Sequence, residues 1–373
     1  MAKDRQGTAR ITIIGTGLIG GSLGLALKAA QLEGIEIVGH DRDRGAANRA
    51  ERAGAIDKAE LNLPRAVEQA HIVIIATPVL AVREVMQQIA EYLQEGAVVT
   101  DTASTKADVL RWAEQLLPTH VSFVGGHPMA GKETPGVDEA EATLFQGKAY
   151  CICPGEGATD QAVRSVIGLA QAVGAEPLFM DAEEHDQYAA AVSHMPLLLS
   201  TALFNLVRSS PAWSDMAQMA SSGFRDATRL ASSDPRMSHD ICVTNREAAV
   251  HWLGRMQSEL ERLKAMLEDA RDEALLETLA RVQIEREEFL RKPPRREREP
   301  STDGTEVRRE MIDALIGGWA AERMRRAQKL PELMKEAREA APAGEGKRPQ
   351  TLGEKIAEDI RRDLEKRSGQ QEK

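Results

Sequence analysis

The residue of this chain best suited to acid–base chemistry is a histidine in a glycine-rich stretch. His127 lies in GGHPMAGKE (residues 125–133), directly after the apolar run 121–124. A histidine, with an unperturbed pKa of about 6.5, can accept a proton at neutral pH. The apolar run predicts a parallel strand that ends before the glycines, where doubly wound sheets bind ligands. His127 is therefore a candidate general base in a loop; the alternative is a histidine that only caps a turn.

A second group of polar residues, DTASTK (residues 101–106), follows the apolar run 97–100. As the end of another predicted strand, it should face the same crevice. Ser104 could hydrogen-bond a substrate hydroxyl or His127, and Lys106 could offer its charge to a ligand carboxylate. Alternatively, a hydroxyl of this segment caps the helix predicted over 108–117, a common role for serine and threonine.

A glycine pattern near the N-terminus predicts the element that would hold a cofactor. A short apolar strand over 10–14 precedes GTGLIG, and apolar residues then recur at helical spacing to residue 30. Gly15 would supply the tight turn, Gly17 the close backbone approach and Gly20 the helix packing. The pyrophosphate of a dinucleotide would sit on the helix N-terminus. The predicted cofactor-binding residues of this loop are Gly15, Gly17, Leu18, Ile19 and Gly20.

An acidic residue bears on the choice of cofactor. Asp41 follows the second predicted strand, 35–39, about 20 residues after the glycines, where a carboxylate accepts hydrogen bonds from a ribose. A carboxylate there would repel the 2′-phosphate of NADP, which favours NAD. Arg42 and Arg44 weaken this argument, because a nearby guanidinium can accept a phosphate.

Further strands predict an α/β, Rossmann-type doubly wound sheet over residues 8–182. The third strand, 71–76, ends in Thr77 and Pro78, which should face the cofactor. Segments 149–153 and 176–180 would complete the sheet around a helix over 161–173.

Residues 183–290 show helical periodicity and no convincing strand, which predicts an all-helical domain. Its first helix contains Ser193-His194-Met195-Pro196, where the proline should bend the axis and could turn His194 toward the nucleotide domain. The alternative is a histidine satisfied inside a helix interface. Arg225 and Arg229 are four apart, so either could clamp a substrate carboxylate from one helix face. Residues 231–267 read as one further long helix with an apolar stripe, part of it a subunit interface.

Composition limits the possible functions. The 373 residues carry a net charge of -10, which argues against a general nucleic-acid or membrane-surface role. The sparse cysteines predict reduced thiols in the cytoplasm, and no spacing predicts a metal site. The apolar run near 195–204 is too short to span a bilayer, and we expect no signal peptide.

Five stretches together resemble the prephenate and arogenate dehydrogenase family of tyrosine biosynthesis, over roughly residues 10–270. They are ITIIGTGLIGGSL, VTDTASTK, FVGGHPMAGKE, HDQYAAAVSHMP and SSGFRDATRLASSDP. The resemblance implies an N-terminal Rossmann-type domain, a C-terminal helical dimerisation domain and an active site between them. It implies NAD-dependent oxidative decarboxylation of prephenate in a cytoplasmic homodimer.

The resemblance also implies roles for individual residues. His127 matches the family's catalytic histidine, and Ser104 the serine that orients the substrate hydroxyl. Arg229 matches the ligand of the substrate carboxylate, Glu133 an acidic residue at the pocket entrance, and His194 the histidine of the family's SHLPH pattern.

This chain departs from SHLPH at its last position, where it carries Leu197 instead of a second histidine that contacts substrate. Arogenate-using relatives also carry an apolar residue there. Prephenate remains the first expectation, because the change removes one contact without supplying a partner for an ammonium group. Arogenate is the alternative.

Residues 291–373 begin with a charged, proline-containing linker and continue with amphipathic segments. We expect a charged, partly helical or disordered tail, or alternatively a partner-docking segment. Two other functions compete with the family reading. A β-hydroxyacid dehydrogenase would need a lysine base on its helical domain, and none is obvious. A non-enzymatic dinucleotide-binding scaffold would act through the tail.

Overall fold

A computed structural model describes residues 9–32, 34–132 and 134–294. Its sheet has eight strands in the order β3-β2-β1-β4-β5-β6-β7-β8. The neighbours from β3 to β6 all pair parallel, β6 pairs antiparallel with β7, and β7 pairs parallel with β8. The strands are β1 (Ala9–Ile14), β2 (Ile35–His40), β3 (Lys58–Ala59), β4 (Ile72–Ile75), β5 (Val98–Asp101), β6 (Ser122–Pro128), β7 (Ala149–Pro154) and β8 (Glu176–Phe179). The reversal of strand order between β1 and β4 is the switch point at which such sheets bind ligands.

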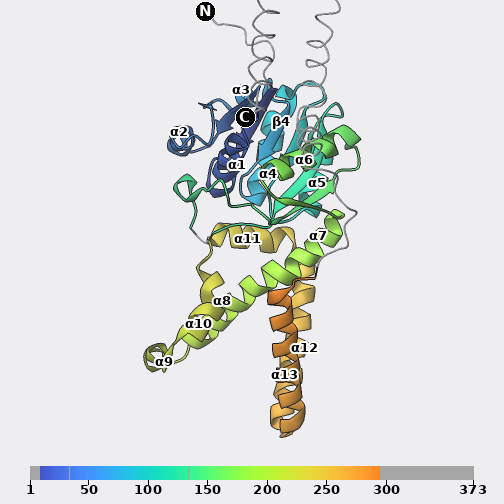
Figure 1. The fold of residues 1–373 in the computed structure, drawn as a ribbon. Helices are drawn as coiled ribbons and strands as arrows, with labels where there is room; N and C mark the ends of the chain where they lie inside the picture. Colours follow the sequence, from blue (N-terminus) through green and yellow to red (C-terminus); the bar gives the residue numbers. More distant parts are fainter. Residues whose placement is uncertain (1–8, 33, 133, 295–373) are drawn as a thin grey trace, which may run out of the picture. The chain divides into compact units, whose positions relative to one another are not determined.

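Helices cover both faces of this sheet (Figure 1). Because alternate side chains of a strand point to opposite faces, Ile72 and Ile74 of β4 pack in one apolar cluster while Val73 and Ile75 pack in the other. The helices are α1 (Leu18–Ala29), α2 (Arg44–Arg52), α3 (Leu63–Val67), α4 (Val79–Ile89), η1 (Ala90–Tyr92), α5 (Ala107–Leu116), η2 (Val137–Glu139) and α6 (Asp160–Ala172). The predicted Rossmann-type sheet is confirmed.

After β8 the described residues form helices alone, as predicted. They are α7 (Ala182–Ala189), the π-helix η3 (Ala190–His194), α8 (Met195–Arg208), α9 (Trp213–Met219), α10 (Ser222–Thr228), η4 (Arg229–Ser232), α11 (Pro235–Thr244), α12 (Arg246–Glu268) and α13 (Asp272–Arg291). Helices α12 and α13 pack side by side (Figure 1).

The single long helix predicted over 231–267 is wrong, because the chain breaks it twice. Asp234 caps a new helix by accepting from the backbone N–H groups of Arg236 and Met237, with Pro235 as the first helical residue. Asn245 leaves helical geometry before α12. The apolar periodicity of the sequence continues across both breaks, so it does not indicate them.

Segments α7, η3 and α8 form one continuous helix of 27 residues, Ala182–Arg208. A π-helical turn directly precedes Pro196, and such turns accommodate a proline that cannot donate its backbone hydrogen bond. By length and composition this helix could cross a membrane, so the prediction from the shorter apolar run was incomplete. However, His185, Asp186 and His194 on it are buried against other parts of the fold.

His127 lies inside β6, opposite Cys151 of β7, and the prediction of a loop is wrong. The pairing with β7 extends the strand through both glycines. Gly126 permits this close packing, since a Cβ there would come within 2.6 Å of the Asp101 carbonyl oxygen and 2.9 Å of the Tyr150 ring.

Replacing Gly126 with alanine should therefore destabilise the protein by about 1–3 kcal/mol through overpacking. Chemical denaturation measures this change in unfolding free energy. The matched control is Gly131→Ala in the same stretch, where a Cβ would meet nothing within 4 Å. Equal stability of both variants would contradict the packing role of Gly126.

Candidate active site

The loop between β1 and α1 has the geometry of a dinucleotide cradle. Gly15 has a φ of +93°, and a Cβ on Gly20 would lie 1.9 Å from the Gly15 carbonyl oxygen, so both positions require glycine. A Cβ on Gly17 would meet nothing within 4 Å, which leaves open space in front of the N-terminus of α1. Leu18 and Ile19 form the first turn of that helix. The loop thus fits the backbone approach that a pyrophosphate needs.

Asp41 directly follows β2, as predicted, and its carboxylate is held by the glycine loop. One oxygen accepts from the Thr16 backbone N–H at 2.8 Å and from the Thr16 hydroxyl at 3.2 Å. The other accepts from the Asp43 N–H at 2.8 Å. These bonds fix the Asp41 carboxylate beside the glycine loop.

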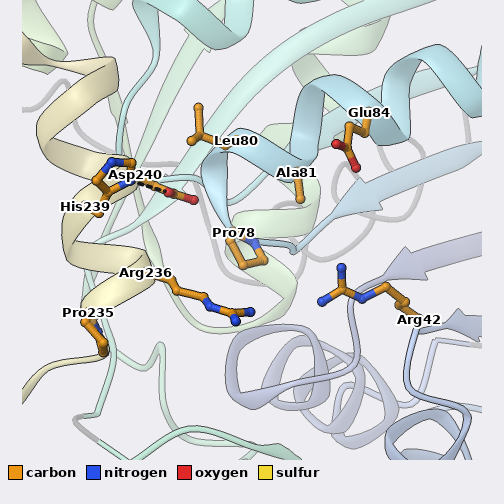
Figure 2. Close-up of a pocket in the computed structure, with 9 residues that line it drawn as sticks. All are labelled: Arg42, Pro78, Leu80, Ala81, Glu84, Pro235, Arg236, His239 and Asp240. Carbon is orange, nitrogen blue, oxygen red and sulfur yellow. Dashed lines mark hydrogen bonds and ion pairs between the residues drawn. The ribbon is translucent and has the colours of Figure 1, made fainter.

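A cavity of about 420 Å³ lies beside this acid, between the ends of β2 and β4 and helix α11. Arg42 follows β2 and Arg236 belongs to α11, and their guanidinium groups point into the cavity from opposite sides (Figure 2). Pro78 also lines it. The neighbouring Thr77 carries a buried hydroxyl without a hydrogen-bond partner in the described structure. Thr77 and Pro78 therefore lie where a ligand held at the switch point would reach them.

A hydrogen-bonded series of three side chains crosses from the helical domain to β6. Nδ1 of His127 lies 2.9 Å from Nε2 of His185, and Nδ1 of His185 lies 2.8 Å from Oδ1 of Asp186. All three residues are buried. Burial, with the nearby His185, Lys106 and His194, holds the pKa of His127 well below its usual range. His127 is therefore a neutral imidazole at neutral pH.

Asp186 also caps α5. Its two carboxylate oxygens accept from the backbone N–H groups of Lys106 at 2.7 Å and of Ala107 at 2.9 Å. The prediction that a hydroxyl of residues 101–106 might cap this helix is wrong: Thr105 Oγ1 instead bonds Thr244 Oγ1 at 2.9 Å. The cap comes from a residue 80 positions away in sequence, a contact that local pattern cannot reveal.

Lys106 is not available to a ligand. Its ammonium is fully buried, pairs with Asp101 and donates to the Gly126 carbonyl at 2.8 Å. The predicted role for its charge is therefore wrong. Burial of an ammonium demands a local partner, and Asp101, at the end of β5, supplies it.

The remaining candidates differ in how they are placed. His194 is buried near His127, and Asn245 Nδ2 lies 3.3 Å from its Nδ1, while its Nε2 has no partner among the described residues. Burial lowers its pKa to about 4 against the opposing charge of Asp186. The backbone of Ser104 also opposes this lowering of the His194 pKa. Of the two predicted partners for the Ser104 side chain, His127 is not bonded to it in the described structure, and Nδ1 of His127 meets Nε2 of His185.

The other two predicted substrate-binding residues are Arg229 and Glu133. Arg229 is exposed at the start of η4, which packs against α8, and Arg225 is exposed in α10. Glu133 lies outside the described residues. Sequence reasoning gave no role to His185, Asp186 or Asn245. The signal for the first two was an adjacent histidine and acid in a helix, at positions that proved buried.

The fold and this site define an oxidoreductase with a nucleotide-binding Rossmann-type sheet and an all-helical domain. Residues 23–178 match the family model described as prephenate dehydrogenase, nucleotide-binding domain, and residues 181–281 match prephenate dehydrogenase, dimerization domain. The chain belongs to the prephenate dehydrogenase family.

Individual relatives agree with this assignment. The chain is 34% identical to the prephenate dehydrogenase of Bacillus subtilis, over 69% of this chain and 70% of that protein. It is 30% identical to the cyclohexadienyl dehydrogenase of Zymomonas mobilis, over 72% of this chain and 91% of that protein. The structure of prephenate dehydrogenase from A. aeolicus, in complex with hydroxyphenyl propionate and NAD⁺, superposes with a TM-score of 0.71. The two share 30% identity over 77% of this chain and all of the other.

The buried pair beneath β6 leads to a prediction. Lys106→Met should lower the free energy of unfolding by roughly 3–5 kcal/mol, because Asp101 is left as an unpaired buried charge. Adding Asp101→Asn to this variant should restore part of the loss. Denaturant unfolding of the three proteins measures it. A stable Lys106→Met protein with a raised substrate KM would instead restore the ligand-binding role.

Proposed function

We propose that this chain catalyses the NAD-dependent oxidative decarboxylation of prephenate to 4-hydroxyphenylpyruvate, with His127 as the general base. The observation that carries the proposal is a neutral imidazole, buried and held by His185, at the ligand-binding end of a dinucleotide-binding sheet. A neutral imidazole can take the proton of a substrate hydroxyl as the carbon bearing it is oxidised.

The residues present fit NAD. The glycine loop leaves room at the N-terminus of α1, and the Asp41 carboxylate would accept hydrogen bonds from the adenosine ribose. When bound, the nicotinamide of NAD supplies the hydride acceptor. Asp41 disfavours the 2′-phosphate of NADP, although Arg42 and Arg236 point into the adjacent cavity. NAD therefore remains the preferred cofactor.

The protein's part in the reaction is to orient the substrate and to move one proton. His127 draws the proton from the hydroxyl as hydride leaves the same ring carbon. The electrons of the broken bond to the ring carboxylate, which departs as carbon dioxide, enter the ring, and His127 returns the proton to the phenolate oxygen. The product ring becomes aromatic, which supplies the driving force. A positioned base typically contributes a factor of 10² to 10⁴, and alignment of the reactants contributes more. We assign the orientation of the hydroxyl to Ser104, and contacts with the substrate to Arg229, His194 and Glu133.

The two candidate substrates, prephenate and arogenate, differ in their side chain. Leu197 is buried in α8 and cannot hydrogen-bond a substrate. One relative is a cyclohexadienyl dehydrogenase, which keeps arogenate as the alternative. Prephenate is preferred because Leu197 supplies no partner for the ammonium of arogenate, and because the relatives include prephenate dehydrogenases.

We also propose a cytoplasmic homodimer formed through the helical domain. Support comes from the match to the family's dimerization domain and from large apolar side chains left exposed on α8, α12 and α13. Burying such a surface against a second copy would remove it from water. These side chains include Leu206, Val250, Leu260, Leu267, Leu276, Leu279 and Ile284.

The proposed reaction is tested by following reduced-nicotinamide formation with prephenate and arogenate, each against NAD and NADP. We expect prephenate with NAD to give the highest kcat/KM. His127→Asn should abolish turnover and leave NAD affinity nearly unchanged. The control His120→Asn, in the turn before β6, should match the parent enzyme. Full activity of His127→Asn would remove the assignment of the base.

The depressed pKa of His127 predicts the pH dependence. A lowered pKa keeps the imidazole neutral, and hence able to accept a proton, down to a pH below the ordinary histidine value of 6.5. Activity should be lost only as pH falls further and His127 becomes protonated. The groups that face it are His185, Lys106 and His194. The measurement is kcat/KM against pH, and an acid limb centred above 6.5 would contradict the burial of the base.

A further inference from the structure

The hydrogen-bonded series Asp186–His185–His127 does more than hold the base in place. We propose that His185 and Asp186 are positioning residues that fix His127 in one tautomer, with its proton on Nδ1 and its lone pair on Nε2. This inference rests on the proposed function of His127 as a base, and it assigns a role to two residues on the helical domain.

Asp186 is the acceptor at one end of the series. The Asp186 carboxylate accepts from two backbone N–H groups at the N-terminus of α5 and lies 2.8 Å from Nδ1 of His185. Because both Asp186 oxygens accept from backbone N–H groups at a helix N-terminus, which favours a carboxylate, Asp186 serves as an acceptor for His185 too. Nδ1 of His185 must therefore carry a proton.

A singly protonated His185 then determines which nitrogen of His127 carries a proton. An imidazole with its proton on Nδ1 offers a lone pair on Nε2. Nδ1 of His127 lies 2.9 Å from this Nε2 atom and must donate its proton to it. Because His127 is neutral, its Nε2 is left with the lone pair. That atom is then free to accept the proton of a substrate hydroxyl.

The opposite arrangement needs a doubly protonated His185 that donates from both nitrogens. His127 would then accept at Nδ1 and carry its proton on Nε2, where it could not act as a base. The arrangement we propose leaves both imidazoles uncharged, whereas the opposite one places a cation beside the Asp186 carboxylate in a site that also buries the ammonium of Lys106. The tautomer of His127 thus depends on contacts made across the domain boundary.

The neighbouring His194 lacks such a series, and its contact with Asn245 favours the opposite tautomer. His194 is also buried, but Asn245 Nδ2 meets its Nδ1, and the amide can donate to that atom. The neutral form of His194 would then carry its proton on Nε2, the opposite tautomer to that of His127. Two buried histidines in one site thereby differ in role: one presents an acceptor and the other a donor.

Two substitutions at His185 test the inference. In His185→Gln the amide oxygen can still accept from Nδ1 of His127, whereas His185→Leu removes the acceptor. We expect kcat to fall at least tenfold in the leucine variant, with the substrate KM within about twofold of the parent value. The glutamine variant should recover most of this loss. His120→Leu is the control for the same change outside the site. Equal kcat values for the glutamine and leucine variants, or a leucine variant as active as the parent, would overturn the positioning role.

Nitrogen-15 NMR of the histidine-labelled protein gives a readout that does not depend on turnover. Signals of His127 are assigned by their absence from His127→Asn. We expect a protonated Nδ1 and an unprotonated Nε2 in the parent and in His185→Gln, and the reverse or a mixture in His185→Leu. A protonated Nε2 in the parent overturns the inference even if the enzyme turns over prephenate. The expected tautomer without turnover of either substrate would instead contradict the proposed function.

Discussion

The arrangement of the site depends on one carboxylate, that of Asp186. It belongs to the helical domain but caps α5 of the nucleotide-binding domain, and one of its two oxygens, Oδ1, also meets Nδ1 of His185. Charged hydrogen bonds to backbone N–H groups are among the stronger ones in proteins, and burial removes competing water. The domain contact and the orientation of the base are thus one interaction. A shift of the helical domain against α5 would disturb both.

Burial produces the chemistry of the site as well as its stability. The strand that carries His127 passes close over Asp101 only because Gly126 lacks a side chain. Desolvation, with smaller effects from His185 and the Lys106 ammonium, lowers the pKa of the imidazole and keeps it neutral. In open solvent the same histidine would be partly protonated near neutral pH. The fold therefore keeps this imidazole uncharged, in the form that can accept a proton.

Sequence reasoning predicted the sheet, the glycine cradle and the position of Asp41 correctly, because these depend on short-range patterns of strand, turn and helix. It failed where contacts between residues far apart in the sequence determine the structure. The extension of β6 through His127 depends on pairing with β7, and the helix cap comes from Asp186. Lys106 looked like a ligand for a substrate carboxylate because its partner Asp101 was read as part of the same exposed loop. The breaks at Asp234 and Asn245 were hidden by an apolar stripe that continues across them.

The central claim is that a neutral imidazole, held from the helical domain, meets the substrate hydroxyl beside the nicotinamide. A crystal structure of the full chain with NAD and a hydroxyphenyl analogue tests it most directly. The account predicts Nε2 of His127 within hydrogen-bond distance of the ring hydroxyl, with Nδ1 still on His185. An imidazole turned away from the nicotinamide, with no space between them for a substrate ring, would contradict it.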